Sequence, residues 1–563
     1  MELKGSDIVV KTLIVQGCTT VFGYPGGTVI DIYDSLFKYA DQIEHVLVTH
    51  EQQAAHAADG YARALGKVGV CLATSGPGST NLVTGIATAF LDSIPLIAIT
   101  GNVSTRQIGT DSFQELDITG VTLPITKHNY FISAAREIAP VMREAFKLAK
   151  SGRPGPVLID IARDAQESYA EFEPEKPVEP QELFAAPSEA IKAAAACINR
   201  ARCPFIYYGG GVTASGAAQE VVELARKINA PMGCSLMGIS AVPQANAEVS
   251  QSNEMRFLGM EGMHGHYASS MAMAHADCII ALGVRFNDRS TGDRATFAPG
   301  ARIVHIDIDA SELSKNLPDD HPLLGDLKLT LQKLIPLINK AEHIHWQAEI
   351  NEYLEEEHKL EDVREGLTPK NIFQILQGFL TPGTPVVTDV GQHQMWAAQM
   401  LKFEQPRTFI SNGGLGTMGF SLGASVGAAI ATGKRVVTVM GDGGFGMCMN
   451  ELATAVTHEL PLVILVFNNG VLGMVRQQQR FMCDKRYSGV ELNRKTDIVA
   501  VAKAFGADGM RVSGIDDLNE ALEHAFAAQG PYLIECMINK EELVLPMMVP
   551  GGSMNDLIVK AGD

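Results

Sequence analysis

The chain has 563 residues, of which 46% are hydrophobic and 19% charged, and its formal net charge is −19 at pH 7. This length is too great for one hydrophobic core, so three domains of ordinary size are expected. The negative charge argues against a nucleic-acid or anionic-membrane surface. Scattered cysteines without a C-x-x-C pair, no apolar run of membrane-spanning length and a polar-interrupted first helix predict a cytoplasmic protein.

Short apolar runs alternate with helical stretches along the whole chain, which is typical of α/β folds with parallel sheets. Two polar passages rich in Pro and Glu, 167–189 and 340–371, interrupt this alternation. Solvated passages of this kind commonly connect domains. We therefore predict three doubly wound parallel-sheet domains, at 1–170, 188–335 and 368–545.

The first and third of these domains share a pattern. GKVGVCLATSGPG (66–78) leads through a helical stretch to DSIPLIAITGN (92–102), and GKRVVTVMGDGG (433–444) leads in the same way to HELPLVILVFNN (458–469). In both, a Gly-Lys turn precedes a strand that ends in a glycine-rich loop. The pattern predicts two homologous copies of one α/β fold; convergence of ordinary βαβ units is the alternative.

In the first domain, Glu51 follows the apolar run HVLV and opens the Ala-rich helix of THEQQAAHAADGYAR (49–63). A glutamate at this position either favours the helix dipole or serves as a catalytic carboxyl group in an apolar setting. The residues of this stretch alone favour the helix-dipole interpretation; the paired folds and the metal-binding motif of the third domain favour the catalytic one.

The central domain carries a nucleotide-binding pattern. FIYYGGGV (205–212) is a strand that runs into a glycine turn, and ADCIIALGVRFNDR (276–289) adds a basic patch. ARIVHIDIDASEL (301–313) places acids at a strand end, where Asp307 could hold a ribose hydroxyl group. The G-x-G-x-x-G motif is not present, so these segments alone do not identify a ligand.

In the third domain, the apolar run RVVTVM (435–440) ends in GDGGFG, and PLVILVF ends in the pair Asn468–Asn469. Both stretches lie at strand ends, where open α/β sheets bind ligands. A carboxylate oxygen of Asp442, an amide oxygen of Asn469 and a backbone carbonyl could hold Mg²⁺ together with phosphate oxygens. A simple β-turn uses the same residue types.

GDG followed after 24 intervening residues by NN resembles the thiamine-diphosphate motif. The resemblance implies that Asp442, Asn469 and the Val471 carbonyl hold Mg²⁺, and that Glu51 contacts the aminopyrimidine ring of the cofactor. In GGLGTMGF (413–420) it makes Met418 the apolar wedge between the two cofactor rings, with a core methionine as the alternative. It also places cofactor contacts at Pro25, Gly26, Gln392, His393, Gly441, Gly443, Gly444 and Met474.

Motifs along nearly the whole chain, among them SGPGSTN (75–81), GTDSFQE (109–115), GMHG (262–265), GVRFNDR and HIDID, are similar to those of the acetohydroxyacid synthase catalytic subunits, also called acetolactate synthases. This resemblance implies FAD in the central domain. The residues that it places at or near FAD are Arg153, Gly210, Met263, His264, Gly283, Arg285, Asp288, Asp307, Ile308 and Asp326.

The activity implied by this resemblance is decarboxylation of pyruvate and transfer of its two-carbon unit to a second 2-ketoacid, pyruvate or 2-ketobutyrate, in valine, leucine and isoleucine biosynthesis. Arg289 would bind the acceptor carboxylate, unless it only forms a salt bridge with Asp288. Phe113 and Gln114 would line the pocket. Many members carry Trp at the position of Gln478, so the acceptor preference stays open.

The family also implies a homodimer as the smallest active unit, with a tetramer possible, and a small regulatory subunit. Pyruvate oxidase and the catabolic, FAD-free acetolactate synthase are the nearest rival enzymes. RFNDR and HIDID favour the flavin-containing biosynthetic form. A non-catalytic cofactor-binding protein is the rival from another class, and the presence of both Glu51 and Asp442 argues against it.

Overall fold

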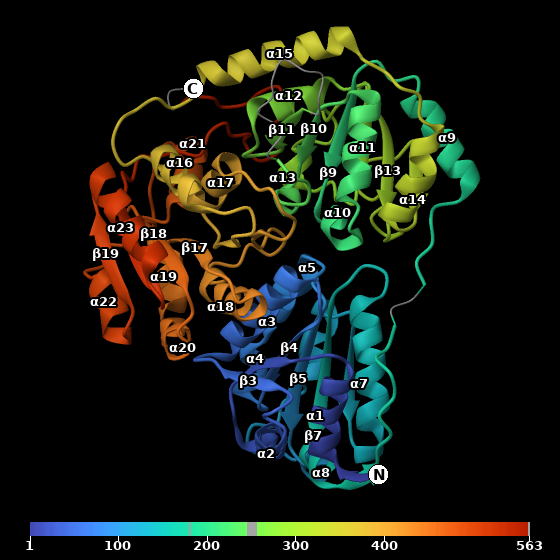
Figure 1. The fold of residues 1–563 in the computed structure, drawn as a ribbon, viewed down its shortest axis with the longest axis vertical. Coiled ribbons are helices and arrows are strands. Elements are labelled where there is room, and N and C mark those ends of the chain that lie inside the picture. The colour runs from blue at the N-terminus through green and yellow to red at the C-terminus, as the bar shows by residue number, and fades with distance from the viewer. Residues whose placement is uncertain (180–181, 245–255, 561–563) are drawn as a thin grey trace.

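A computed structural model describes residues 1–179, 182–244 and 256–560 and divides them among three domains (Figure 1). Each domain is built on a six-stranded, all-parallel sheet flanked by helices. The first domain lies at the bottom of Figure 1, the third at the left and the central one at the upper right. The prediction of three doubly wound parallel-sheet domains is therefore confirmed.

The sheet of the first domain has the order β3-β2-β4-β5-β7-β6. A short antiparallel pair, β1 with β8, joins the N-terminus to the end of the domain. The elements are β1 Glu2–Lys4, α1 Gly5–Val15, β2 Thr20–Gly23, η1 Gly27–Val29, α2 Ile30–Lys38, β3 Glu44–Leu47, α3 Glu51–Leu65, β4 Gly69–Ala73, α4 Pro77–Asn81, α5 Val83–Leu91, β5 Leu96–Asn102, η2 Thr105–Gln107, α6 Ile118–Thr122, η3 Leu123–Ile125, β6 His128–Ile132, α7 Ala135–Lys150, β7 Pro156–Ala162, α8 Arg163–Glu167 and β8 Tyr169–Glu171.

The central sheet has the order β11-β10-β9-β12-β13-β14, which is 3-2-1-4-5-6 along the chain. This is the strand order of dinucleotide-binding folds. The elements are α9 Ser188–Ile198, β9 Pro204–Tyr208, α10 Gly210–Ser215, α11 Ala218–Ile228, β10 Met232–Cys234, η4 Leu236–Gly238, β11 Phe257–Met260, α12 Tyr267–His275, β12 Cys278–Leu282, α13 Asp288–Thr291, β13 Arg302–Asp307, β14 His321–Leu324, α14 Leu327–Leu334 and η5 Ile335–Leu337.

The third sheet has the order β16-β15-β17-β18-β20-β19. Counted along the chain this is 2-1-3-4-6-5, the same order as in the first domain. Identical topology supports two copies of one fold. The elements are α16 Pro369–Phe379, β15 Val386–Thr388, α17 Gln392–Met400, β16 Phe409–Ile410, α18 Ser421–Thr432, β17 Val436–Gly441, α19 Asp442–Cys448, η6 Met449–Glu451, α20 Leu452–Thr457, β18 Leu462–Asn468, α21 Gly473–Met482, α22 Ile498–Phe505, β19 Asp508–Val512, α23 Ile515–Ala527 and β20 Tyr532–Met537.

Helices α3 and α18 join the first and third domains, and they lie side by side where the blue and orange parts of Figure 1 meet. Small residues make this crossing possible. A Cβ atom added to Gly427 would lie 1.8 Å from Ala57 O, and one added to Gly60 would lie 2.1 Å from Ala424 O. The two backbones are therefore close enough that only glycine fits at both positions.

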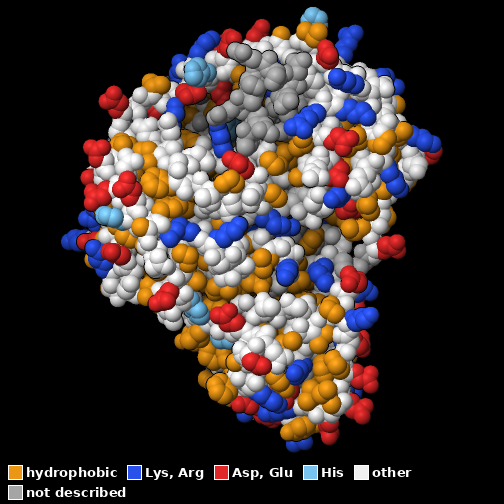
Figure 2. Space-filling model, in the orientation of Figure 1, with side chains coloured by type: hydrophobic (Ala, Val, Ile, Leu, Met, Phe, Trp, Pro, Cys, Tyr) orange, Lys and Arg blue, Asp and Glu red, His pale blue; other side chains and the backbone are white. Residues whose placement is uncertain are grey.

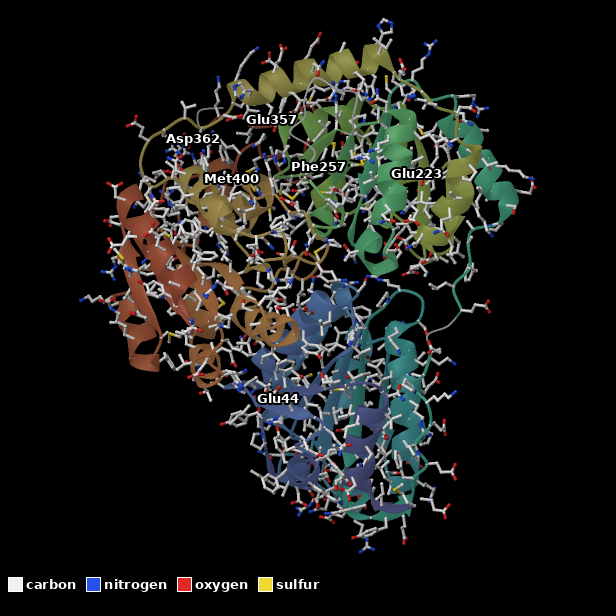
Figure 3. All side chains as sticks on the ribbon, viewed as in Figure 1. Glu44, Glu223, Phe257, Glu357, Asp362 and Met400 are labelled. Carbon is white, nitrogen blue, oxygen red and sulfur yellow. The ribbon has the colours of Figure 1, made fainter. Side chains whose placement is uncertain are left out.

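The passage 340–371, which composition predicts to be a solvated connector, contains the helix α15, Ile344–Lys359. It lies across the top of the central domain, where Figure 3 labels Glu357. Trp346 and Ile350 are buried, Trp346 Nε1 donates to Pro204 O at 3.1 Å, and Glu357 Oε2 accepts from Ala268 N. The i, i+4 spacing of Trp346 and Ile350 gives the helix an apolar face that overall polarity conceals.

The segment after β20 returns from the third domain to the central one. Met548 and Met554 belong to a central-domain hydrophobic cluster, and Met548 N donates to Met263 O at 2.8 Å. On the third-domain side, Trp396 Nε1 donates to Leu543 O at 3.2 Å. Figure 3 labels Met400, at the end of the same helix, α17, beside the central domain. The C-terminal segment thus ties two domains together.

Candidate active site

Reversal points of the strand order position the site. In the third domain the order reverses between β15 and β17, which pair from Val386↔Val437 to Thr388↔Val439. Open α/β sheets bind ligands outside the carboxyl ends of the strands at such points. β15 leads into Gln392 and β17 leads into Asp442, so the topology brings two distant motifs to one edge of the sheet.

Asp442 begins α19 directly behind β17 and is buried. Its Oδ1 accepts a 3.0 Å hydrogen bond from Gly443 N, and its Oδ2 accepts one of 3.0 Å from Gly470 N. Burial raises the pKa of Asp442 to about 6, against the opposing effect of these bonds and of Arg494. A bound cation would favour the charged carboxylate.

The other two predicted metal ligands lie in the loop behind β18. Asn469 Oδ1 accepts a 3.1 Å hydrogen bond from Val471 N, and Gly470 N reaches Asp442 Oδ2. Val471 is buried and forms an antiparallel bridge with Glu491, which fixes the loop. Asp442, Asn469 and Val471 are therefore close neighbours.

The chemistry of these donors fits Mg²⁺. One carboxylate, one side-chain amide and backbone carbonyls are hard oxygen ligands, which Mg²⁺ prefers when phosphate oxygens and water complete its shell. Within the described ranges no cluster of three or more His, Cys, Asp or Glu side chains could hold a metal ion. A cavity of about 210 Å³ opens beside Asp442 and is also lined by Asn468, Gly470 and Arg494.

His393 and Gly441 face each other across the β15–β17 reversal. A Cβ atom at Gly441 would lie 3.2 Å from His393 Nδ1. His393 is buried, burial lowers its pKa to about 3, and its Nε2 lacks a partner among the described residues. A neutral imidazole with a free buried nitrogen can donate a hydrogen bond to an anion.

The predicted cofactor-facing loop 413–420 lies against α19. A Cβ atom at Gly443 would lie 3.3 Å from Met418 Cε and 2.8 Å from Leu472 Cδ2. A Cβ atom at Gly444 would lie 1.9 Å from Asp389 Oδ2, so this glycine is required for the close approach. Met474 is half-buried on α21 and packs against the main hydrophobic cluster.

Asp389 has a role that sequence reasoning did not assign. Both of its carboxylate oxygens accept from Gly419 N, at 2.8 and 3.0 Å, which fixes the end of the loop that carries Met418. The residue is fully buried, and burial raises its pKa to about 6. The only signal in the sequence was an acid at the end of a short apolar strand.

Glu51 begins α3 in the first domain and is buried. Asn81 Nδ2 donates a 2.9 Å hydrogen bond to Glu51 Oε2, and a Cβ atom at Gly78 would lie 3.4 Å from Glu51 Oε1. A Cβ atom at Gly26 would lie 2.4 Å from Thr74 Cγ2. Gly26 and Thr74 follow β2 and β4, the strands at the reversal point of this sheet.

Three further observations concern the surroundings of Glu51. Burial, together with the nearby charge of Glu51, raises the pKa of Tyr33, whose hydroxyl group has no partner among the described residues. Thr49 Oγ1 donates a 2.7 Å hydrogen bond to Glu451 Oε2 of the third domain. A Cβ atom at Gly76 would lie 2.8 Å from Gln114 Cβ, so Gln114 lies against the SGPG turn, whereas its neighbour Phe113 is 86% exposed.

In the central domain the order reverses between β9 and β12. The glycines that follow these strands touch: a Cβ atom at Gly211 would lie 2.6 Å from Gly283 Cα, and Gly283 has a φ of +54°. Gly210 begins the helix α10 at the same turn. The turn is open to the close backbone approach that a diphosphate needs.

Cations and acids surround this glycine turn. Arg285 is half-buried, its guanidinium makes no hydrogen bond or ion pair with the described part of the chain, and burial beside Arg153 lowers its pKa. Asp307, at the end of β13, accepts from Asp309 N at 2.8 Å, and burial raises its pKa. An unpaired guanidinium and a strand-end acid fit the diphosphate and ribose of a dinucleotide.

Other residues predicted near FAD also have structural roles in the fold. Arg153 links the first domain to the central one, because its guanidinium donates to Ser93 Oγ at 2.7 Å and to Glu312 Oε1 at 2.9 Å. Asp326 Oδ1 caps α14 by accepting from Leu329 N at 2.8 Å. Ile308 directly follows β13 and is half-buried.

Arg289 lies on α13 with an exposed side chain. Its Nη1 donates to Met263 Sδ at 3.1 Å, while its Nε lies 3.6 Å from Oδ2 of Asp288, which is also exposed. An ion pair between exposed side chains contributes little, so the guanidinium stays available for an anion. His264, beside Met263, is buried, and burial lowers its pKa to about 4.

Comparison with known proteins decides the family. Thiamine pyrophosphate enzyme models match the chain in order: the N-terminal TPP binding domain at 3–121, the central domain at 191–334 and the C-terminal TPP binding domain at 389–536. The chain is 42% identical to the acetolactate synthase isozyme 2 large subunit of Escherichia coli K12, over 99% of this chain and 100% of that one. It is 41% identical to the probable acetolactate synthase large subunit of Methanocaldococcus jannaschii, over 99% of this chain and 95% of that one.

The chain belongs to the acetolactate synthase large subunits. These proteins form a family of thiamine-diphosphate-dependent enzymes, so the predictions of family, fold and enzyme class are confirmed. No helix in the described ranges is both long and apolar enough to cross a membrane.

Proposed function

We propose that this chain catalyses the acetolactate synthase reaction with thiamine diphosphate, Mg²⁺ and FAD as cofactors. It would decarboxylate pyruvate and join the two-carbon unit to a second 2-ketoacid, in the biosynthesis of branched-chain amino acids. The observation that carries the proposal is the meeting of Asp442, Asn469 and Val471 at one loop junction behind β17 and β18.

Asp442 and Asn469 would supply the side-chain oxygens for Mg²⁺, and Val471 its carbonyl. Mg²⁺ would in turn bind the diphosphate of the cofactor, helped by the neutral His393 at the reversal point. At Gly441, Gly443 and Gly444 a Cβ atom would meet His393, Leu472 or Asp389, so glycine lets the backbone of this turn stay close to its neighbours. The same turn would contact the diphosphate.

When bound, thiamine diphosphate supplies a carbon nucleophile and a sink for the electrons released with CO₂. Glu51 would hold the proton at the aminopyrimidine ring, and Asn81 fixes the orientation of its carboxyl group. Met418, whose Cε lies next to Gly443, would keep the two cofactor rings bent toward each other. Gln114, which lies against the SGPG turn, and Phe113 would line the pocket beside the reacting carbon.

The acceptor 2-ketoacid keeps its carboxylate and therefore needs a cation. Arg289 is exposed and has only a weak partner in Asp288, so its guanidinium can bind this carboxylate with two parallel hydrogen bonds. Met263, which accepts from Arg289 Nη1, directs the side chain.

The central domain would bind FAD. Its strand order is that of dinucleotide-binding folds, its reversal point carries the Gly209–Gly211 and Gly283 contact, and Arg285 is an unpaired cation beside it. The net reaction transfers no electrons, so the flavin would have a structural task. Pyruvate oxidase, the rival on the same scaffold, would instead reduce its flavin with pyruvate.

A homodimer would complete the active site. Large apolar side chains are exposed on or near the segments that carry predicted site residues: Phe113 (86%), Leu123 (70%) and Met447 (60%). Others gather over β3 and α2 of the first domain, where Figure 2 shows orange side chains close together; Ile30, Phe37 and Leu47 are exposed there. A second copy would cover these surfaces and place its Glu51 against the diphosphate end of the first.

A small regulatory subunit is a further partner, because relatives of this chain are named large subunits. The net charge of −19 gives no support to nucleic-acid binding.

The test is a competition assay with pyruvate and 2-ketobutyrate in which thiamine diphosphate, Mg²⁺ and FAD are each omitted in turn. We expect acetolactate and acetohydroxybutyrate, with product formation lost without thiamine diphosphate or Mg²⁺. Product without thiamine diphosphate would refute the proposal. Bleaching of the flavin absorbance by pyruvate alone would favour the oxidase.

A further inference from the structure

Gln477 lies where α21, the start of α17 and the C-terminal segment meet. It lies on α21, is only 1% exposed, and uses both ends of its side-chain amide. Its Oε1 accepts from Gln392 Nε2 at 2.9 Å and from Val544 N at 2.8 Å, and its Nε2 donates to Val544 O at 2.9 Å. One amide thus connects the diphosphate loop with the C-terminal segment.

The backbone of Val544 fixes which way this amide faces. A backbone N–H only donates and a backbone C=O only accepts, so Gln477 must direct Oε1 toward the N–H and Nε2 toward the C=O. The buried Oε1 therefore remains available as the acceptor for Gln392. A reversed amide would leave both backbone groups of Val544 unpaired, which is costly inside a protein.

The orientation of the Gln477 amide determines, through Gln392, the orientation of the amide of Asn469, the predicted metal ligand. Gln392 Nε2 donates to Gln477 Oε1 and also to the backbone carbonyl of Glu542 at 2.8 Å. Its Oε1 is then turned toward Asn469 Nδ2, at 3.5 Å. Asn469 consequently keeps its nitrogen on the Gln392 side and directs Oδ1 toward the metal loop, where it also accepts from Val471 N.

The geometry leaves little room for another arrangement. Gly473 lies beside the pair, and a Cβ atom added to it would lie 2.0 Å from Gln392 Oε1 and 2.9 Å from Asn469 Nδ2. Gln392 and Gln477 are both buried, so water does not replace a lost bond at low cost.

We propose that Gln477 is a positioning residue for the metal–diphosphate end of the site: through Gln392 it sets the amide of Asn469 with its oxygen toward the cation. This inference rests on the proposed Mg²⁺ site. Removing a residue that orients a metal ligand through hydrogen bonds typically lowers metal affinity by about 10- to 100-fold. Gln477→Leu keeps a buried side chain of similar size but removes the amide that orients Gln392.

The same helix offers a matched control. Gln479 Nε2 donates to Ser488 O at 3.0 Å, and Gln479 Oε1 accepts from Ser488 N at 3.1 Å, so this amide makes the same kind of backbone pair. It has no hydrogen bond to Gln392. Gln479→Leu removes the same pattern of backbone hydrogen bonds at a more exposed position of α21 and leaves the chain of amides intact.

The experiment titrates Mg²⁺ into purified protein with fixed thiamine diphosphate and follows tryptophan fluorescence. The chain has two tryptophans, and a Trp346→Phe background leaves Trp396, which donates to Leu543 O beside the junction. We expect Gln477→Leu to raise the half-saturating Mg²⁺ concentration about 10- to 100-fold. We expect Gln479→Leu to match the parent protein.

A conservative variant sharpens the test. At pH 6 a protonated glutamic acid at position 477 can donate to Val544 O and accept from Gln392, so Gln477→Glu should recover most of the affinity, to within about fivefold of the parent. If Gln477→Leu does not fold, Gln477→Asn, which is too short to reach both partners, is expected to show the same loss.

The outcomes separate the two claims. Equal Mg²⁺ titrations of the parent and of Gln477→Leu or Gln477→Asn would overturn the role of Gln477 while leaving the metal site in place. A parent protein whose cofactor binding does not depend on Mg²⁺ would overturn the proposed metal site itself.

Discussion

Asn81 Nδ2 donates a 2.9 Å hydrogen bond to Oε2 of Glu51, and this pair joins the end of α4 to the start of α3. The bond leaves Glu51 Oε1 beside the Gly78 turn, where the glycine contributes no side chain. Two segments that the sequence analysis treated separately, SGPGSTN and the helix of Glu51, therefore form one unit. The hydrogen bond from Asn81 orients the carboxyl group of this unit.

Glu51→Gln should lower kcat about 100-fold or more, because the variant loses a proton-transferring carboxyl group that typically contributes this much. The fold should survive, since the amide can still accept the bond from Asn81. Steady-state rates and thermal midpoints check both statements. Glu44→Gln, an exposed residue of β3 labelled in Figure 3, is the control; wild-type-like rates in Glu51→Gln would contradict the assigned role.

Asp442→Asn should raise the half-saturating Mg²⁺ concentration by more than about 100-fold, because it removes a charged ligand of the cation. Even the loss of a residue that only hydrogen-bonds to a metal ligand typically lowers metal affinity about 10- to 100-fold. Isothermal titration of Mg²⁺ in the presence of thiamine diphosphate measures this. Unchanged affinity in the variant would place the cation elsewhere.

Gly427→Ala should destabilise the α3–α18 junction by about 1–3 kcal/mol or more, because the new methyl group would lie 1.8 Å from Ala57 O. Gly378→Ala on α16 is the matched control: nothing lies within 4 Å of its Cβ position, and the change should stabilise the protein by about 0.5–1 kcal/mol. Thermal midpoints of the two variants should therefore move in opposite directions, and a shift of the same sign would refute the close packing.

Asp160→Asn should remove one source of pH dependence. Asp160 is buried between Thr100 Oγ1 (2.7 Å) and Asn102 Nδ2 (2.6 Å), and burial raises its pKa to about 6. A raised folded-state pKa means that the folded state binds the proton on Asp160 more tightly than the unfolded state does. Protonation of Asp160 therefore stabilises the folded protein fully below about pH 4, and this stabilisation is lost as the pH rises to 6.

Relative to Asp160→Asn, the wild type should thus lose up to about 3 kcal/mol between pH 4 and pH 6 and little beyond it. The difference between their thermal midpoints, measured from pH 4 to pH 8, checks this. The exposed residue Asp41, changed to Asn, should show no such trend. A constant difference across the range would argue against the raised pKa of Asp160.

Gln478→Trp should shift the acceptor preference toward 2-ketobutyrate. The residue is half-buried on α21, and an indole would add apolar surface for the extra methylene of this acceptor. One buried CH₂ group contributes about 0.8 kcal/mol, or about fourfold in the product ratio. Competition between pyruvate and 2-ketobutyrate at equal concentrations measures the ratio; no change would place Gln478 outside the acceptor pocket.

Site residues could be predicted from the sequence where a polar residue lies just after a strand. The order of buried apolar runs and glycine loops locates Asp442, Asn469, Glu51 and Asp307 at strand ends, because parallel strands expose their carboxyl ends at one edge. Composition marks 340–371 as a connector between domains but does not reveal the helix within it. Its charge conceals the apolar face of α15, and only the packing of Trp346 against β9 shows that the helix belongs to the central domain.

The sequence by itself indicated the three parallel-sheet domains and the residue types at the reversal points, since these follow from local pattern and spacing, and the resemblance of its motifs to known proteins indicated the family. Only the tertiary structure decided which side chains hold those residues in place: Asn81 for Glu51, Asp389 for the loop of Met418, and Gln477 for Gln392. The reason is physical. Such bonds join residues far apart in the chain, and their direction depends on backbone groups that the fold alone brings together.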